Sequence, residues 1–317
     1  MQPGRSCPLH YRYGPEALAP ERALECETLY VVGGLYGNEA ALAEILAMAD
    51  REPGGATLVF NGDHNWFDVD AGSFRRINEG VLRHVALRGN VETEIAHDDD
   101  SAGCGCGYPA WVSDAEVERS NAIIQALRAT ARSCPEVRAA LAALPMYRVA
   151  AVGGLRIAIV HGDLESLAGW SYAQEVLEDS AQRKHVARQC DRAGVRVIAS
   201  SHTCLPVATG FDTPLGRGVL INNGAAGMPN FHGTRHGVIT RIALSPARDA
   251  LYGCRLGPLH VDALPVHYDH DAWVRAFLAS WPAGTPAHES YYDRITLGPR
   301  YELSAAIRWG GAIASVT

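Results

Sequence analysis

The sequence lacks the features that mark membrane, secreted and nucleic-acid-binding proteins. No apolar run reaches the roughly 18 residues that a helix needs to cross a bilayer, and the N-terminal segment has no apolar signal-peptide core. Lys and Arg are not clustered, and 28 of them against 35 Asp and Glu give a net charge of -7. Phosphate backbones are held mainly by clustered basic residues, so we expect no strong nucleic-acid binding. The lack of a long apolar run and of a signal-peptide core leads us to expect no membrane binding and a cytoplasmic location.

The sequence also lacks a regular cysteine framework. Its eight cysteines show no repeated spacing; they lie at positions 7, 26, 104, 106, 134, 190, 204 and 254. In a reducing compartment, such cysteines are expected to be free thiols or metal ligands rather than disulfides.

The chain does contain enough apolar sequence for a full core. A length of 317 residues with 47% hydrophobic content predicts one large domain, or one domain with an insertion. Four prolines in residues 1–25 predict a loosely ordered lead-in. We expect the core to span 26–261 and a C-terminal tail to span 262–317, with a helix over 271–280 and an extended strap, both packed on the core.

Polar residues recur at the points where apolar runs stop. They form five short groups, which are residues 34–38, Gly62-Asp63, Gly89-Asn90, His161-Gly162-Asp163 and Ser201-His202-Thr203-Cys204. Ligands of open α/β sheets gather outside the carboxyl ends of strands, where side chains from several strands converge. The recurrence therefore predicts one shared site.

The order and spacing of these groups resemble the motifs of the calcineurin-like metallophosphoesterases. Those motifs run Asp-x-His, Gly-Asp, Gly-Asn-His-Asp/Glu, a lone His and Gly-His-x-His. By position, Asp63 matches the carboxylate that bridges two metal ions in that family, while Asn90, His161 and His202 match the other ligands of the second metal. The resemblance implies a metal-dependent phosphohydrolase with Asp63, His161 and His202 as catalytic residues, and the loop at 221–229 is similar to one in smaller bacterial members.

The positions that match the first metal's ligands depart from the family pattern. They hold Gly34, Tyr36 and Cys204, and Val91 stands where the family has its leaving-group acid, with Glu92 next to it. Cys204 is a further candidate ligand, although an inert thiol is the more frequent role for a lone cysteine. The surviving carboxylate, amide and imidazole set suits Mn, Fe, Ni or Zn, so we expect one or two divalent transition metal ions.

A mainly helical insertion is predicted between the third and fourth polar groups, at about residues 95–146. Ser113 with Glu116 is a capping-box signature that begins a helix over 113–132, and a second helix is predicted over 135–144. Because the insertion leaves a strand at the ligand side, we expect a cap that shapes the substrate pocket. Cys104 and Cys106, with His97 and three aspartates, could form a second metal site or supply first-metal ligands, but a solvated acidic turn is favoured.

The remaining pattern alternates strands and helices and then becomes a run of strands. Helices are predicted over 38–52 and 170–192, and later strands over 195–200, 205–209, 217–221, 236–244 and 251–255. This order predicts an α/β fold with two packed sheets flanked by helices. It agrees with the four-layer α/β/β/α metallophosphoesterase sandwich that the resemblance implies.

Three hypotheses about function follow from these observations. The first is a phosphomonoesterase or phosphodiesterase that acts on a small phosphorylated molecule by a metal-activated water. Arg88, His232, Arg235 and Asn38 lie beside the motif loops and are candidates for substrate binding, although each could equally be a structural or surface group. The alternative is a catalytically inactive ligand-binding or partner-binding protein of the same fold; a different metal-dependent reaction that uses Cys204 is a third possibility. The sequence does not indicate an oligomeric state.

Overall fold

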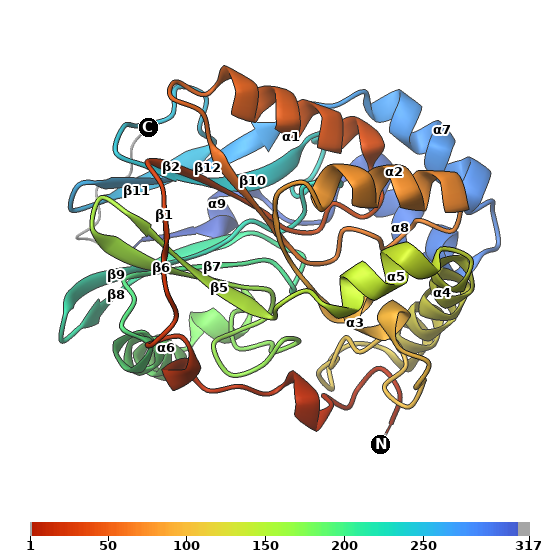
Figure 1. Cartoon of the computed structure of the whole chain (residues 1–317), viewed down its shortest axis with the longest axis horizontal. Helices are drawn as coiled ribbons and strands as arrows, with labels where there is room; N and C mark the ends of the chain where they lie inside the picture. The colour runs from red at the N-terminus through yellow and green to blue at the C-terminus, as the bar shows by residue number, and fades with distance from the viewer. Residues whose placement is uncertain (1, 310–317) are drawn as a thin grey trace.

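Two β-sheets packed face to face form the centre of the molecule (Figure 1). The computed structural model describes residues 2–309. The six-stranded sheet has the order β11-β12-β10-β2-β3-β4, and the seven-stranded sheet has the order β1-β5-β6-β7-β9-β8-β13. Helices cover both outer faces, which confirms the predicted four-layer α/β/β/α sandwich.

The six-stranded sheet combines parallel and antiparallel strands. β2 (Thr28–Val32), β3 (Thr57–Asn61) and β4 (Val85–Leu87) are parallel, and β10 (Gly237–Ala243), β12 (Leu259–Val266) and β11 (Tyr252–Leu256) continue the sheet in antiparallel pairing. Every residue of β2 is buried, as is usual for a strand covered on both faces. Its outer face packs against α1 (Glu39–Arg51) and α2 (Ala71–Val81).

The seven-stranded sheet receives most of its strands from the middle of the chain. Its members are β1 (Leu24–Glu25), β5 (Tyr147–Val152), β6 (Leu155–Val160), β7 (Val197–Ser200), β9 (Gly216–Asn222), β8 (Val207–Thr213) and β13 (Ile307–Arg308). The helix α6 (Ser180–Ala193) covers its outer face through Val186 and Cys190. Between the two sheets, β-branched side chains such as Val31, Val59, Ile157 and Ile221 form the main core.

A group of helices packs at one end of the sandwich, on the right in Figure 1. It contains α3 (Asn90–Ala96), α4 (Asp114–Arg132), α5 (Pro135–Ala142), α7 (His270–Ser280) and α8 (Pro286–Leu297). The two predicted helices of the insertion are therefore present, and the Ser113 hydroxyl caps α4 by accepting from the Glu116 amide at 3.2 Å. The short helix α9 (Leu303–Ala306) precedes β13.

The structure corrects the expected course of residues 170–192. The first ten residues form turns and a 3-10 turn, η3 (Val176–Glu178), and the helix begins only at Ser180. Asp179 stops the helix from starting earlier because its side chain accepts from the Ala181 amide at 2.8 Å as an N-cap.

The C-terminal tail also differs from the expectation. The position 262 lies inside β12, which pairs along its length with β10, so the central sheet extends beyond 261. The helix expected over 271–280 is present as α7, but α8 follows where an extended strap was expected. Pro286 occupies the first turn of α8, where its missing N–H has no consequence.

The first 25 residues contain little regular structure, namely the turns η1 (Leu9–Tyr11) and η2 (Pro15–Ala17) and the start of β1. This segment was expected to be loosely ordered, yet Tyr11 and Leu18 are fully buried. Prolines prevent helix formation here, but apolar side chains still pack the segment onto the core. Among the described helices, none has the length and apolarity that crossing a bilayer would need.

A buried ion pair ties the N-terminal segment to the helical group. Arg128 of α4 donates to the Glu94 carboxylate of α3 at 2.7 Å, and Tyr11 donates to the same carboxylate at 2.5 Å. Arg128 is 1% exposed and Glu94 is 4% exposed. Removal of one partner from such a pair leaves a buried charge without compensation.

We therefore expect Arg128→Met to lower the free energy of unfolding by about 3 kcal/mol, because Glu94 would lose its cation. The matched control is Arg132→Met, which breaks the exposed pair with Asp98 and should cost less than about 1 kcal/mol. Urea denaturation of both variants measures the difference, and equal losses would contradict the role assigned to the buried pair.

Candidate metal centre

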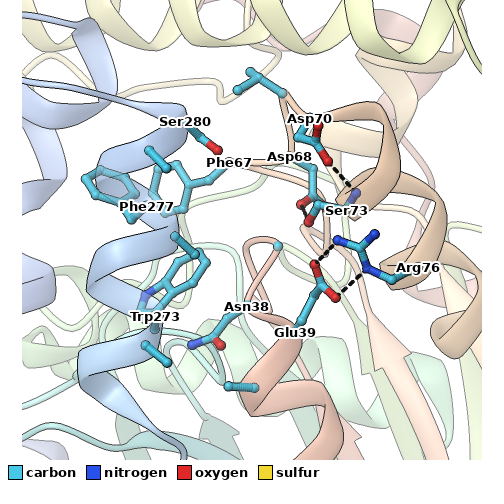
Figure 2. Close-up of a pocket in the computed structure, with 16 residues that line it drawn as sticks. Asn38, Glu39, Phe67, Asp68, Asp70, Ser73, Arg76, Trp273, Phe277 and Ser280 are labelled. Carbon is cyan, nitrogen blue, oxygen red and sulfur yellow. Dashed lines mark hydrogen bonds and ion pairs between the residues drawn. The ribbon is translucent and has the colours of Figure 1, made fainter.

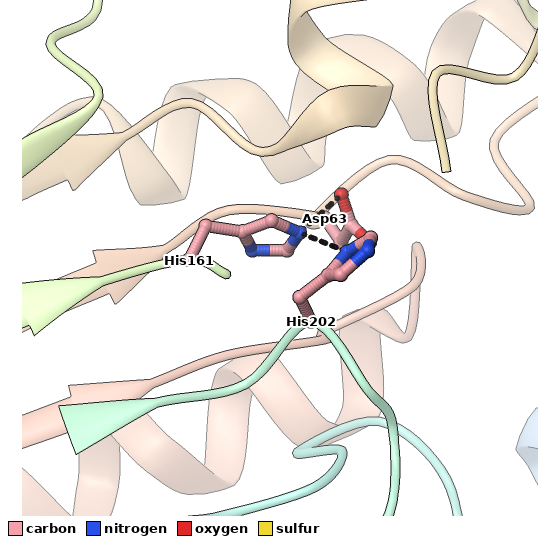
Figure 3. Close-up of side chains that lie close together, drawn as sticks. All are labelled: Asp63, His161 and His202. Atoms are coloured by element: carbon pink, nitrogen blue, oxygen red, sulfur yellow. Dashed lines mark hydrogen bonds and ion pairs between the residues drawn. The ribbon is translucent and has the colours of Figure 1, made fainter. Parts of the chain in front are cut away.

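Four polar side chains meet where strands of the two sheets end. Asp63 follows β3, Asn90 begins α3 after β4, His161 follows β6 and His202 follows β7. Figure 3 shows the side chains of Asp63, His161 and His202 pointing toward one another. Ligand atoms of these three residues all lie within 4.8 Å of one another, and all three residues are buried.

His161 lies at the centre of this group. Its Nε2 atom lies 3.3 Å from Asp63 Oδ1, 3.2 Å from Asn90 Oδ1 and 3.1 Å from His202 Nδ1. The sequence therefore placed these four residues together correctly by the order of strand ends. Their roles as metal ligands and catalytic groups remain predictions.

Backbone carbonyls determine which ring nitrogens face the group. His161 Nδ1 lies 2.9 Å from the Asn61 carbonyl, and His202 Nε2 lies 3.0 Å from the Cys106 carbonyl. A carbonyl oxygen can only accept, so these two nitrogens carry the protons. The neutral rings therefore present bare nitrogens to each other and to two oxygen acceptors, and this arrangement is favourable only with a cation among them.

The pKa values of the two histidines are shifted by burial and by the neighbouring groups of the site. Burial, together with neighbouring His161, lowers the pKa of His202 to about 3. Burial also acts to lower the pKa of His161, but the Asp63 carboxylate outweighs it and the pKa is raised. The required cation is thus either a proton on His161 or a metal ion, and a carboxylate, an amide oxygen and two imidazoles form a donor set that suits a divalent transition metal.

Glu92 holds the two loops that carry Asp63 and Asn90. Its buried carboxylate accepts from the backbone N–H groups of Asp63 at 2.7 Å, His64 at 3.0 Å and Gly89 at 2.9 Å. The residue next to the motif's missing acid therefore acts as a structural clamp. The sequence located Glu92 but gave no indication of this role, because the three amides come from two separate loops.

Backbone strain is concentrated at the site. Among the described residues, three non-glycine residues have positive φ, and these are Tyr36 at 55°, Asp63 at 54° and Cys204 at 63°. Such conformations are uncommon for residues with a Cβ atom and persist where the surroundings hold them. All three occur in the motif loops, so the loops are fixed in shapes that unsupported chains avoid.

Tyr36 and Cys204, which the resemblance matched to ligand positions of the first metal, contact each other. The Tyr36 hydroxyl lies 2.9 Å from Cys204 Sγ, and a Cβ atom at Gly34 would come within 2.9 Å of the Tyr36 ring. Burial raises the pKa of Tyr36 well above its ordinary value and also raises the pKa of Cys204. The pair is therefore neutral, and Cys204 lies outside the group of converging ligand atoms in the described chain.

Three of the metal-ligand candidates, Asp63, Asn90 and His202, border a cavity of only about 30 Å³. Its walls are largely aromatic and include Tyr36, Trp66, Tyr108, Trp170 and Tyr291. A single water needs roughly 10 to 15 Å³ by this kind of measure, so the cavity has room for an ion and about one water. A phosphorylated molecule would require part of the wall to move.

Cys104 and Cys106 differ from the expectation of free thiols, because they are joined as a disulfide. Gly103, Gly105 and Gly107 all have positive φ and fold the loop so that the two Cα atoms lie 5.3 Å apart. The acidic turn beside them is solvated, as was favoured, and Asp98 in it pairs with Arg132 and Arg138. Residues 2–309 contain no second group of converging metal ligands there.

The four residues predicted to bind substrate do not line the cavity. Arg88 turns toward the end of α5, with Nη1 3.5 Å from the Ala142 carbonyl, and Arg235 is exposed and pairs with Asp271 at 3.5 Å. His232 is exposed, and Asn38 is the buried N-cap of α1. Adjacency to a motif in sequence does not make these side chains adjacent to the site, because each loop turns away within a few residues.

Residues outside the sequence motifs complete the walls of the site. Trp170 donates to the Cys106 carbonyl at 2.9 Å and its ring lies 5.4 Å from that of His202. Arg294 of α8 donates to the Cys204 carbonyl at 2.5 Å, and Tyr291 of the same helix lines the cavity. These contacts join segments more than 30 residues apart, and no local pattern marks them.

Comparison with solved structures identifies the fold. A hypothetical protein from Pyrococcus horikoshii OT3 superposes with a TM-score of 0.55 at 17% identity, and the alignment covers 86% of this chain and 99% of that one. A metallophosphoesterase from Sphaerobacter thermophilus gives a TM-score of 0.54 at 16% identity with the same coverage. No model of a known protein family matches the sequence, and no curated protein does. The chain therefore has a metallophosphoesterase-like sandwich fold.

The clamp leads to a stability prediction. Glu92→Gln leaves one carbonyl oxygen to serve three buried amides, so we expect the free energy of unfolding to fall by about 2 kcal/mol. Glu118→Gln, at an exposed position of α4, is the control and should change it by less than about 0.5 kcal/mol. Urea denaturation monitored by circular dichroism measures both, and an unchanged midpoint for Glu92→Gln would exclude the clamp.

Proposed function

We propose that this protein is a metal-dependent phosphoric ester hydrolase whose centre holds one divalent transition metal ion through Asp63, Asn90, His161 and His202. The observation that carries the proposal is the convergence of four acceptor groups in one buried site, a donor set that suits a divalent transition metal ion. A metallophosphoesterase from Sphaerobacter thermophilus with the same fold supports the reaction class. The expected cytoplasmic location and the small phosphorylated substrate remain parts of this proposal.

A bound ion would supply Lewis-acid polarisation of a phosphoryl oxygen and a more acidic water. The residues of the chain orient that chemistry. The Asn61 and Cys106 carbonyls hold the two imidazoles in the tautomers that leave Nε2 of His161 and Nδ1 of His202 free. The aromatic walls exclude bulk water, which strengthens electrostatic interactions at the centre.

The contact between Tyr36 and Cys204 supports occupancy by one ion, because these residues stand where the family pattern has ligands of its first metal. Tyr36 fills the space beside Gly34, and its hydrogen bond to Cys204 engages both groups in neutral form. Neither group offers an anionic ligand in this state. A second ion 3.5 to 4 Å from the first, as in two-metal enzymes, would need ligands that these loops do not present.

The replacement of the family's acid by Val91 restricts the substrates. Val91 lines the cavity and cannot donate a proton to a leaving group. We therefore propose that esters with good leaving groups, such as aryl esters, and diesters whose leaving oxygen reaches another donor are better substrates than alkyl phosphate monoesters.

A catalytically inactive binding protein is the second candidate, and the small cavity favours it. A volume of about 30 Å³ is far below the several hundred Å³ of ordinary ligand pockets. In that function the metal site would be structural, and a ligand or partner would bind elsewhere on the surface.

Metal analysis tests the proposed centre. Protein purified without added metal and then reconstituted with Mn²⁺ or Zn²⁺ should contain one ion per chain by inductively coupled plasma mass spectrometry. His161→Ala should lose the ion, because it removes the central ligand, whereas Cys204→Ser should retain it. Two ions in the wild type, with one lost in Cys204→Ser, would instead indicate a rebuilt two-metal site.

Hydrolysis assays separate the enzyme from the binding protein. We expect bis-p-nitrophenyl phosphate to be hydrolysed in the presence of Mn²⁺, and the rate to fall by about 100-fold or more in His161→Ala, a loss comparable with removal of a main catalytic group. The control His185→Ala changes a partly exposed histidine of α6 and should keep the wild-type rate. A metal-loaded wild type without activity on any ester would favour the binding protein, and fast hydrolysis of an alkyl monoester would contradict the restriction from Val91.

A further inference from the structure

A second, much larger depression lies on the other side of the metal-site loops. It has a volume of about 670 Å³ and is bordered by the first turns of α1 and α2, the segment 67–70 and one face of α7. This size is within the range of sites for small organic ligands. Figure 2 shows the groove with aromatic side chains of Phe277 and Trp273 on one side and the carboxylates of Glu39, Asp68 and Asp70 on the other.

Asp68 is the most unusual residue of this groove. It is only 3% exposed, and its Oδ1 atom accepts from the Ser73 hydroxyl at 2.9 Å. Its Oδ2 atom is buried and has no hydrogen-bond partner among residues 2–309. A buried carboxylate oxygen without a donor is costly, so Asp68 has capacity for a donor that the described chain does not supply.

The other charges of the groove do not compensate Asp68. Arg76 is the one basic lining residue, and it forms a two-point ion pair with Glu39 at 2.7 and 2.8 Å. Asp70 caps α2 by accepting from the Ser73 amide at 2.8 Å. With Asp68 ionised, three carboxylates therefore face one guanidinium group, and the groove has a negative charge.

The opposite wall is aromatic. Phe67, Trp273 and Phe277 line the groove, and the Phe67 ring contacts Phe277 at a centroid distance of 5.1 Å. Aromatic faces attract cations as well as apolar groups. Ala272, Ala276 and Ala279 of α7 line the groove beside these rings, which are themselves almost fully buried.

We propose that this groove is a binding site for a small organic ammonium ion with an apolar or aromatic body. The ammonium group donates to the free oxygen of Asp68, and the body packs on Trp273 and Phe277. Metal ions are a poorer match, because Asp68 is the only carboxylate of the groove whose buried oxygen lacks a partner in the described chain.

The protonation of Asp68 supports this ligand chemistry. Burial raises the pKa of Asp68 to about 8, with Glu39 and Asp70 acting in the same direction and Ser73 and Arg76 against it. The face of α7 contributes no charged lining residue. Below pH 8 the free protein must therefore lose a proton from Asp68 to pair with an ammonium ion, so ligand affinity should rise with pH up to about 8.

The groove shares two loops with the metal centre. Tyr36 borders the metal cavity while Gly37 and Asn38 border the groove, and Asp63 and Trp66 border the cavity while Phe67 and Asp68 border the groove. An occupant of the groove would thus contact the reverse side of the loops that hold Asp63. The binding proposal itself does not depend on hydrolase activity.

Calorimetric titration with 2-phenylethylammonium tests the proposal, with 2-phenylethanol as the neutral analogue of nearly the same shape. At pH 8.5 we expect the ammonium ion to bind at least tenfold more tightly than the alcohol, a difference typical of a charge-assisted hydrogen bond. Its affinity should fall by roughly tenfold per pH unit below pH 8. Equal affinities of the two probes, or no binding of the ammonium ion at millimolar concentration, would overturn the proposal.

Two variants separate the site from general effects. Asp68→Asn should weaken the ammonium ion at least tenfold and remove the pH dependence, while the hydrogen bond from Ser73 is kept. Ala276→Trp, at an exposed position of α7, should fill the groove and abolish binding without a change in the core. Asp100→Asn, in the exposed turn, is the matched control and should bind as the wild type does. Unchanged binding in both groove variants would show that the site is elsewhere.

Discussion

The carboxylate of Glu92 is the contact on which the geometry of the candidate metal centre depends. It accepts from three backbone N–H groups in the loops after β3 and β4, and these amides are buried. Water cannot replace Glu92 there, so the carboxylate is the partner that makes burial of both loops possible. Asp63 stands at positive φ between two of these contacts, and the clamp supplies the support that this conformation needs.

Around that clamp, four potential metal ligands converge, and Tyr36 and Cys204 contact each other beside them. The imidazoles of His161 and His202 are held by carbonyls from β3 and from the insertion, which leaves their bare nitrogens directed at Asp63 and Asn90. Tyr36 and Cys204 are joined by a hydrogen bond between neutral groups. The result is a site with one strong requirement for a cation and little free volume, and this combination explains why one ion is a better proposal than two.

The C-terminal helices change what the sandwich can bind. α8 supplies Tyr291 to the cavity wall and Arg294 to the Cys204 loop, and α7 supplies the aromatic wall of the groove. The loops at 36–38 and 63–68 therefore line the cavity with some of their residues and the groove with others. Because both depressions share these loops, a ligand in the groove and an ion in the cavity would act on the same backbone segments.

The sequence alone indicated the sandwich, through its order of strands and helices and its resemblance to the family motifs. It also grouped the four central residues, because polar side chains at the carboxyl ends of strands tend to converge. It also determined α4 and its cap, which depend on contacts three residues apart. It could not determine that α6 begins at Ser180, that α8 replaces a strap, or that Arg88, His232 and Arg235 turn away from the site.

Those features were decided by the tertiary structure. The clamp by Glu92 and the contact of Tyr36 with Cys204 join segments that are distant in the chain, and packing also leaves one oxygen of Asp68 without a partner in the described chain. Local sequence patterns indicate which side chains can be buried and which can form hydrogen bonds. Only tertiary packing decides which donor meets which acceptor and which acceptor is left without a donor.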